Sequence, residues 1–212
     1  MNLPPFLVAI VIIAVLINVL YAIKRKPTGI EKYLEEERLA EDAPINPVPQ
    51  EFYFVPDISS LPLDNVYKNV SERAKEKIRR LQETIKKRSS AKMLRFPKHY
   101  TNNELKLSYG AASLNRISGQ EERFADYAFS VEALGNLLLE EGYAEDAKLL
   151  FKHCVSMPCG QTGPYCKLAE LLAKEGDREG LLTLRENAEV AELSADRKTI
   201  EFIDSFINNS SD

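Results

Sequence analysis

Residues 131–154, VEALGNLLLEEGYAEDAKLLFKHC, and residues 165–188, YCKLAELLAKEGDREGLLTLRENA, carry the same pattern, displaced by 34 residues. Identical residues occupy the pairs Leu134/Leu168, Leu137/Leu171, Leu138/Leu172, Glu141/Glu175, Gly142/Gly176, Glu145/Glu179 and Leu150/Leu184, and small residues occupy Gly135/Ala169 and Cys154/Ala188. A fixed period of this length indicates stacked structural repeats. Leu, Glu, Ala and Lys dominate the last two thirds of the chain, which favours helices.

The first copy resembles the tetratricopeptide repeat, a helix–turn–helix unit of 34 residues. Leu134 and Gly135 stand where that family has Leu-Gly, and Ala147 and Phe151 take its small and aromatic positions in the second helix. The resemblance implies that such positions specify packing. The expected repeat-packing residues are Leu134, Gly135, Gly142, Ala147, Phe151, Cys154, Leu168, Ala169 and Gly176.

The second copy departs from the family at two positions. Leu181 replaces the small residue and Arg185 replaces the aromatic one, so we expect this hairpin to pack less closely. At least three repeats are normally needed to bury a continuous core, so flanking helices must cap the array. We expect them at residues 102–118, 120–129 and 194–208, and residues 120–141 form either one long helix or two.

An uncharged stretch precedes all of this. Residues 3–23, LPPFLVAIVIIAVLINVLYAI, would span about 30 Å as a helix, the thickness of a bilayer core. Basic residues follow the stretch but do not precede it, which predicts a cytoplasmic C-terminal domain and an outside N-terminus. A bacterial plasma membrane suits this topology, and a eukaryotic organelle stays open. The anchor residues are Phe6, Ile12, Asn18, Tyr21, Lys24, Arg25 and Lys26.

The predicted fold class is therefore all-α: a single N-terminal transmembrane helix and a short tetratricopeptide-like α-hairpin array with capping helices. We divide the chain into an anchor with its basic flank (1–26), a proline-rich acidic linker with an extended arm (27–64), a basic amphipathic helix (65–98) and the repeat domain (99–212). Within the linker, residues 30–42 favour a short acidic helix. Residues 51–63 are apolar but broken by prolines, and form either an arm packed along the domain or a peptide ligand for its groove.

A continuous apolar stripe predicts a helix over residues 65–88, formed by Val66, Val70, Ala74, Ile78, Leu81 and Ile85. Residues 72–98 hold 11 Lys and Arg against 3 Asp and Glu. The basic face is a solvated surface or a contact for anionic lipid headgroups. Nucleic acid is a weaker alternative, because aromatics are not interleaved with the cations. Candidate contacts to a partner or to lipid are Asn136, Arg73, Lys77, Arg80 and Lys87.

Few residues suggest chemistry. His153 and Cys154 are neighbours, about 100° apart on a helix, which does not suit a catalytic pair. A zinc site from these residues with Cys159 and Cys166 lacks the usual cysteine spacing. We therefore expect no catalytic residue, cofactor or metal, and no enzyme.

The expected function is a membrane-tethered adaptor or scaffold that holds an unidentified protein at the cytoplasmic face. The alternative is a non-catalytic structural or assembly subunit of a membrane complex.

Overall fold

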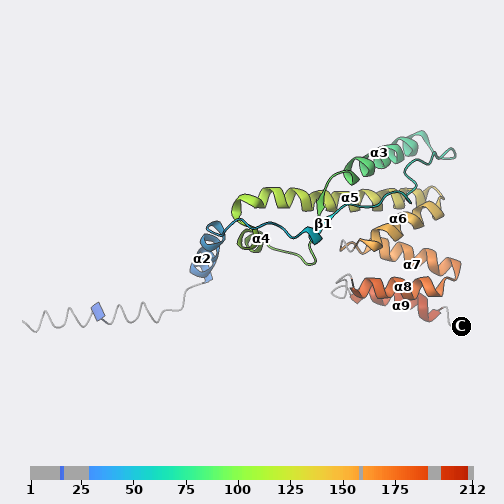
Figure 1. Cartoon of the computed structure of the whole chain (residues 1–212). Coiled ribbons are helices and arrows are strands. Elements are labelled where there is room, and N and C mark those ends of the chain that lie inside the picture. Colours follow the sequence, from blue (N-terminus) through green and yellow to red (C-terminus); the bar gives the residue numbers. More distant parts are fainter. Residues whose placement is uncertain (1–14, 17–28, 158–159, 191–196, 210–212) are drawn as a thin grey trace, which may run out of the picture. The chain divides into compact units, whose positions relative to one another are not determined.

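The computed structural model describes residues 15–16, 29–157, 160–190 and 197–209. These residues are mostly helical, which confirms the all-α prediction (Figure 1). In chain order the elements are α2 (Gly29–Glu41), η1 (Gln50–Phe52), β1 (Tyr53–Phe54), α3 (Glu72–Ser89), β2 (Met93–Leu94), α4 (Asn102–Tyr109), η2 (Ala111–Ser113), α5 (Leu114–Glu140), α6 (Ala144–Ser156), α7 (Gly163–Glu175), α8 (Arg178–Val190) and α9 (Arg197–Asn209).

The predicted membrane span, residues 3–23, lies outside the described residues except for Val15 and Leu16. Within the described part of the chain, no helix has the length and apolar character needed to cross a bilayer. The predicted anchor residues Phe6, Ile12, Asn18, Tyr21, Lys24, Arg25 and Lys26 also lie outside the described residues. The anchor therefore stays a prediction from sequence.

The chain divides into two compact units, and the first consists of residues 1–46 and 101–112. In its described part, α2 packs on α4, and Lys106 forms an ion pair with Glu41. The prediction of an acidic helix over residues 30–42 is confirmed. The helix expected over residues 102–118 instead ends at Tyr109. Gly110 follows with a φ of 81°, and a Cβ there would lie 3.0 Å from the Cα of Ile45.

The second unit consists of residues 47–100 and 113–212. Helices α5 to α9 follow one another as an antiparallel stack, with short turns inside the α5–α6 and α7–α8 hairpins (Figure 1). The two turns contain Gly142 and Gly176 with φ values of 87° and 70°. This left-handed conformation is one that glycine adopts without a steric penalty. The two copies of the sequence pattern therefore end their first helices in the same way.

The repeated apolar positions lie in one core. Buried members of the predicted packing set are Leu134, Gly135, Ala147, Phe151, Cys154, Leu168 and Ala169. Gly135 permits the closest contact, because a Cβ there would lie 2.8 Å from Cε1 of Phe151. In the second copy Leu181 is buried. Arg185, which stands where the first copy has Phe151, forms an ion pair with Asp204 of α9 at 2.6 Å.

Helix α5 decides between the two alternatives for residues 120–141, because it is one helix of 27 residues. Helices α3 and α6 and strand β2 all pack on it. Helix α3 begins later than predicted, at Glu72. Ser71 is its N-cap, with its hydroxyl accepting a hydrogen bond from the Ala74 amide at 3.1 Å. The stripe was therefore wrong at Val66 and Val70, which precede the helix.

Residues 47–71, called the arm here, run along the second unit without an α-helix, through η1, β1 and a turn at Ser59 and Ser60. Strand β1 of the arm pairs antiparallel with β2, matching Tyr53 with Leu94. Further along, Leu61 and Leu63 belong to the same hydrophobic core as the repeats, and the Phe54 ring packs edge-on against Phe124. The interpretation of residues 51–63 as an arm packed along the domain is confirmed.

Candidate interaction site

Hydrogen bonds hold the arm against helices α3 and α6. The Gln82 amide on α3, which is buried, donates hydrogen bonds to the carbonyl oxygens of Pro62 and Asn65, both at 3.1 Å. The side chain of Asn65 and the hydroxyl of Tyr67 donate to the Asp146 carboxylate on α6, at 3.0 and 2.6 Å. Asp146 lies in the first turn of its helix, where the helix dipole favours a negative charge.

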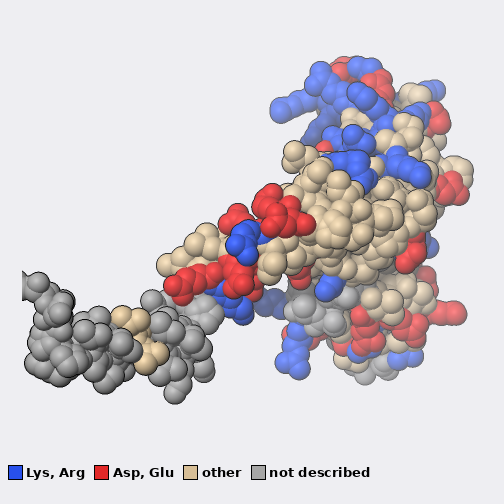
Figure 2. Space-filling model, turned by 60° about the vertical axis from the view of Figure 1, so that its left-hand side comes forward, with Lys and Arg blue, Asp and Glu red and all other residues tan. Residues whose placement is uncertain are grey.

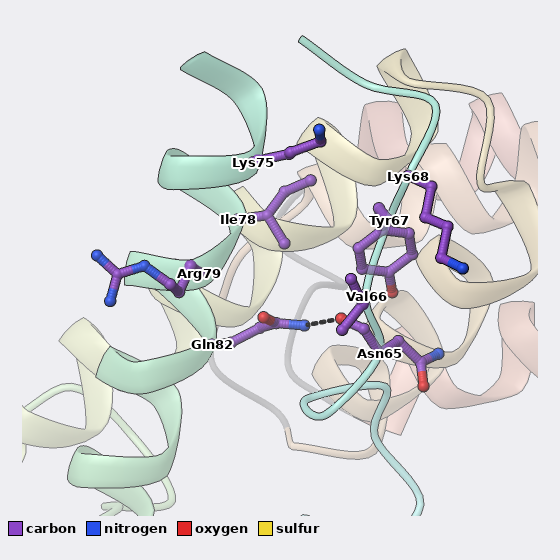
Figure 3. A pocket seen from close by; sticks show the side chains of 8 residues that line it. All are labelled: Asn65, Val66, Tyr67, Lys68, Lys75, Ile78, Arg79 and Gln82. Atoms are coloured by element: carbon purple, nitrogen blue, oxygen red, sulfur yellow. Dashed lines mark hydrogen bonds between the residues drawn. The ribbon is translucent and has the colours of Figure 1, made fainter. Parts of the chain in front are cut away.

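A cleft of ≈ 330 Å³ lies between α3 and the arm, and is called the arm cleft here. It is lined by Asn65, Val66, Tyr67, Lys68, Lys75, Ile78, Arg79 and Gln82. Figure 3 shows Ile78 and Lys75 pointing from α3 toward the arm, with the Gln82–Asn65 hydrogen bond across the cleft. Ile78 and Tyr67 are buried, whereas the Val66 side chain is 83% exposed. The arm cleft therefore has an apolar base and an uncovered apolar residue beside it.

The charged side chains that line the arm cleft are all basic. None of its eight lining residues is acidic. Lys75 is paired with Glu72, and Arg79 is paired with Glu76 and projects away from the arm in Figure 3. Lys68 is exposed and forms no ion pair with any residue in the described ranges. Burial, followed by the contact with Asp146, raises the pKa of Tyr67, so its hydroxyl remains a donor. A ligand that carries an apolar side chain next to a carboxylate would therefore fit the arm cleft.

The candidate contact residues from the sequence do not line the arm cleft. Arg73, Lys77, Arg80 and Lys87 are exposed on α3, and Figure 2 shows Lys and Arg gathered over the part of the surface that α3 forms. Asn136 is half-buried on α5. The arm cleft was missed because residues 65–71 were expected to be helical. If residues 65–71 had been assigned as non-helical, the sequence would have shown an apolar residue, Val66, with no helical stripe to bury it and with the basic Lys68 close by. That pattern is the signal for this cleft.

A second groove, of ≈ 480 Å³, lies between α6, α7 and α8. Its apolar residues are Val155, Leu168, Leu172 and Leu184. Acidic and basic residues both surround it, including Lys152, Asp177 and Glu179, so no charge sign is favoured there. Of the predicted repeat-packing residues, only Leu168 reaches this groove. The charged residues that line the arm cleft are of one sign, whereas those of this groove are mixed.

His153 and Cys154 contact different partners. The Nε2 atom of His153 lies 2.8 Å from the Tyr127 hydroxyl, while the buried Cys154 thiol faces the Ala128 carbonyl oxygen at 4.0 Å. Burial lowers the pKa of His153, and the Asp57 carboxylate partly offsets this effect. Among the described residues, no group of three possible metal ligands comes together. Cys159, which belonged to the hypothetical zinc set, lies outside the described residues.

Replacing His153 with glutamine is expected to flatten the dependence of stability on pH. Because burial lowers the folded-state pKa of His153, the unfolded chain binds more protons as pH falls below about 6.5. The stability present above this pH is then lost on acidification, with a slope of at most about 1.4 kcal/mol per pH unit for one proton. Urea unfolding between about pH 8 and 5 would measure it. Parallel profiles for the wild type and His153→Gln would contradict the assignment.

No protein-family model matches the sequence, and no characterised protein or solved structure is significantly similar to it.

Proposed function

We propose that this chain is a membrane-tethered adaptor, which holds a partner protein at the cytoplasmic face in a cleft supported by a tetratricopeptide-like domain. The observation that carries the proposal is the arm cleft, with its apolar base, its cationic edge and the exposed Val66. A side chain that leaves water for this cleft would cover Val66 and contact Ile78. A carboxylate beside it would meet Lys68. The proposed ligand is a short protein segment with one apolar side chain flanked by acidic residues.

Three features support a tetratricopeptide-like array. The sequence period is 34 residues, the turns at Gly142 and Gly176 share a left-handed glycine, and Gly135 contacts the Phe151 ring. Helix α9 packs on α7 and α8, as a solvating cap does in repeat proteins. These features concern the packing of helices and supply no reactive group, so they support a binding role better than a catalytic one. They do not select the ligand, which is argued from the arm cleft.

The size of the arm cleft supports a tethered arrangement. A volume of ≈ 330 Å³ accommodates one or two side chains. Burying one large aliphatic side chain stabilises a complex by about 1.5–3 kcal/mol, which is too little for tight binding from solution. Confinement to the same membrane raises the effective concentration of the two partners. The predicted anchor at residues 3–23 would supply this confinement, with the second unit in the cytoplasm.

Photo-crosslinking in living cells would test the proposal. A benzoylphenylalanine placed at Val66 is expected to give a discrete protein adduct in the membrane fraction. The same probe at Val55, an exposed arm residue outside the cleft, is the matched control and is expected to give none. Lys68→Glu is expected to reduce the adduct by about tenfold, because it places a carboxylate where an acidic segment would dock.

Equal adducts at the two positions, or an adduct that is insensitive to Lys68→Glu, would refute docking in the arm cleft. A stable one-to-one complex that resists high salt would instead identify a structural subunit, because an adaptor bound through few contacts should dissociate. Protection of the C-terminal domain from a protease inside the cell, together with its cleavage from outside, would overturn the proposed topology.

A further inference from the structure

A third cleft, of ≈ 440 Å³, lies between the C-terminal half of α3 and helix α5. Its lining residues are Thr84, Lys87, Arg88, Ala91 and Arg123, and it is called the basic cleft here. Three of the five carry a positive charge, and none is acidic. Lys87 and Arg88 come from α3 and Arg123 from α5, so two elements direct cations to one space.

Most of the positive charge in the basic cleft is uncompensated. Arg88 Nη1 is paired with Asp126 Oδ2 at 2.5 Å. Lys87 and Arg123 are both exposed and make no ion pair with any other residue that the structure describes. The nearby Glu83 on α3 is paired with Arg79 at 2.8 Å. An anion in the cleft would therefore meet two unpaired cations, as well as the remaining N–H groups of Arg88.

We infer that the basic cleft binds the phosphate group of an anionic phospholipid at the membrane surface. Guanidinium groups form paired hydrogen bonds to phosphate oxygens, and a lysine adds a point charge. A phosphomonoester carries nearly two negative charges at neutral pH, which matches the two unpaired cations. This inference concerns residues outside the arm cleft and does not rest on protein docking there.

The surroundings of the basic cleft favour a lipid surface over a phosphorylated peptide. Apart from Ala91, its lining offers no aliphatic or aromatic side chain that could hold a peptide residue. Further along α3, Arg73 and Lys77 are also exposed, without an ion pair in the described ranges. Basic residues that extend over one face attract a charged bilayer collectively, whereas a single short-chain lipid in a neutral micelle would contact only the residues of the basic cleft. Figure 2 shows Lys and Arg side chains gathered over the part of the surface that α3 forms.

The test uses the full-length chain in neutral detergent. The chain contains no tryptophan, so Ser90→Trp, at the exposed end of α3 next to Ala91, provides a single fluorescent reporter. The probes are short-chain phosphatidic acid, short-chain phosphatidylcholine and inorganic phosphate. Phosphatidic acid is expected to bind saturably, and at least about tenfold more tightly than inorganic phosphate, because its acyl chains lie in the micelle. Phosphatidylcholine is expected to give no saturable change.

Charge variants distinguish a site from diffuse attraction. Arg123→Glu and Lys87→Glu are each expected to weaken phosphatidic acid binding by about tenfold, since each removes a charge-assisted contact. Arg73→Glu, on the same helix but outside the cleft, is the matched control and is expected to change it less than about threefold. Arg123→Gln provides a milder variant, and far-UV circular dichroism verifies that each protein is folded.

Three results would overturn the inference. Equal weakening by Arg73→Glu would show attraction to the whole face of α3. Equal affinity for inorganic phosphate and phosphatidic acid would show a site for the free ion. Tighter binding of a phosphoserine peptide than of phosphatidic acid would show a protein ligand. Failure of the Val66 crosslink leaves these measurements unaffected, because Val66 does not line the basic cleft.

Discussion

Phe151→Ala is expected to lower the free energy of unfolding by about 3–5 kcal/mol. The Phe151 side chain is fully buried, in the second helix of the first hairpin. Its ring lies directly against Gly135 of α5, where even a methyl group would come within 2.8 Å. The contact is too close for the helices to collapse far into the space that a deleted ring would leave. The cavity cost therefore adds to the lost burial of apolar area.

A matched control comes from the same pair of helices. Phe129 on α5 is 60% exposed, and Phe129→Ala removes the same atoms. Because Phe129 packs little, its replacement is expected to change stability by no more than about 0.5 kcal/mol. Urea unfolding followed by far-UV circular dichroism would measure both variants. Similar losses for the two substitutions would contradict the role of the Gly135–Phe151 contact.

The repeats were predictable because their signal is local. Leu134 and Leu168, like Gly142 and Gly176, recur at a fixed spacing, and each hairpin is formed by neighbouring segments of the chain. The presence of Arg185 where the first copy has Phe151 was also visible. Its consequence was not visible, because the partner Asp204 belongs to a helix 19 residues away. Packing positions can be read from periodicity, whereas the partner that covers a changed position depends on the assembled fold.

The start of α3 shows where the sequence pattern fails. Val66 and Val70 continue the four-residue spacing of the stripe, so periodicity alone extends the helix backward. The Ser71 N-cap ends it locally. Hydrogen bonds from Asn65 and Tyr67 to Asp146 then hold the preceding residues, across separations of 81 and 79 residues. No spacing rule contains that information, and the arm cleft exists only because those contacts form.

For helix α5, the local sequence predicts a helix boundary at Gly119 that the structure does not have. Gly119 interrupts a run of better helix formers, and a single glycine costs a helix about 1 kcal/mol relative to alanine. The helix nevertheless continues through it, because α3, β2 and α6 all pack along α5 and together outweigh that cost. Gly110 ends a helix instead, because its positive φ and the nearby Ile45 backbone leave no room for a side chain. A glycine therefore lies inside one helix and ends another, and tertiary contacts decide which of the two occurs.

Leu63→Ala is expected to lower the free energy of unfolding by about 2–5 kcal/mol, a core-sized effect from a residue in an extended segment. Leu63 is only 3% exposed and belongs to the core that the repeats share. The neighbouring Pro62 carbonyl accepts a hydrogen bond from the buried Gln82 amide, so a displaced arm would also leave that amide without a partner. The arm thus acts as a structural part of the second unit.

Val55→Ala provides the control, because Val55 lies in the same arm and is 62% exposed. It is expected to change stability by no more than about 0.5 kcal/mol in the same urea titration. Leu63→Ala should also reduce the Val66 crosslink, since the arm cleft requires the arm to remain on α3. A stable Leu63→Ala protein that loses the crosslink would show an arm that detaches without unfolding the core. A stable protein that keeps the crosslink would show that Leu63 does not hold the arm, and that the other contacts of the arm, among them those with Gln82 and Asp146, are sufficient.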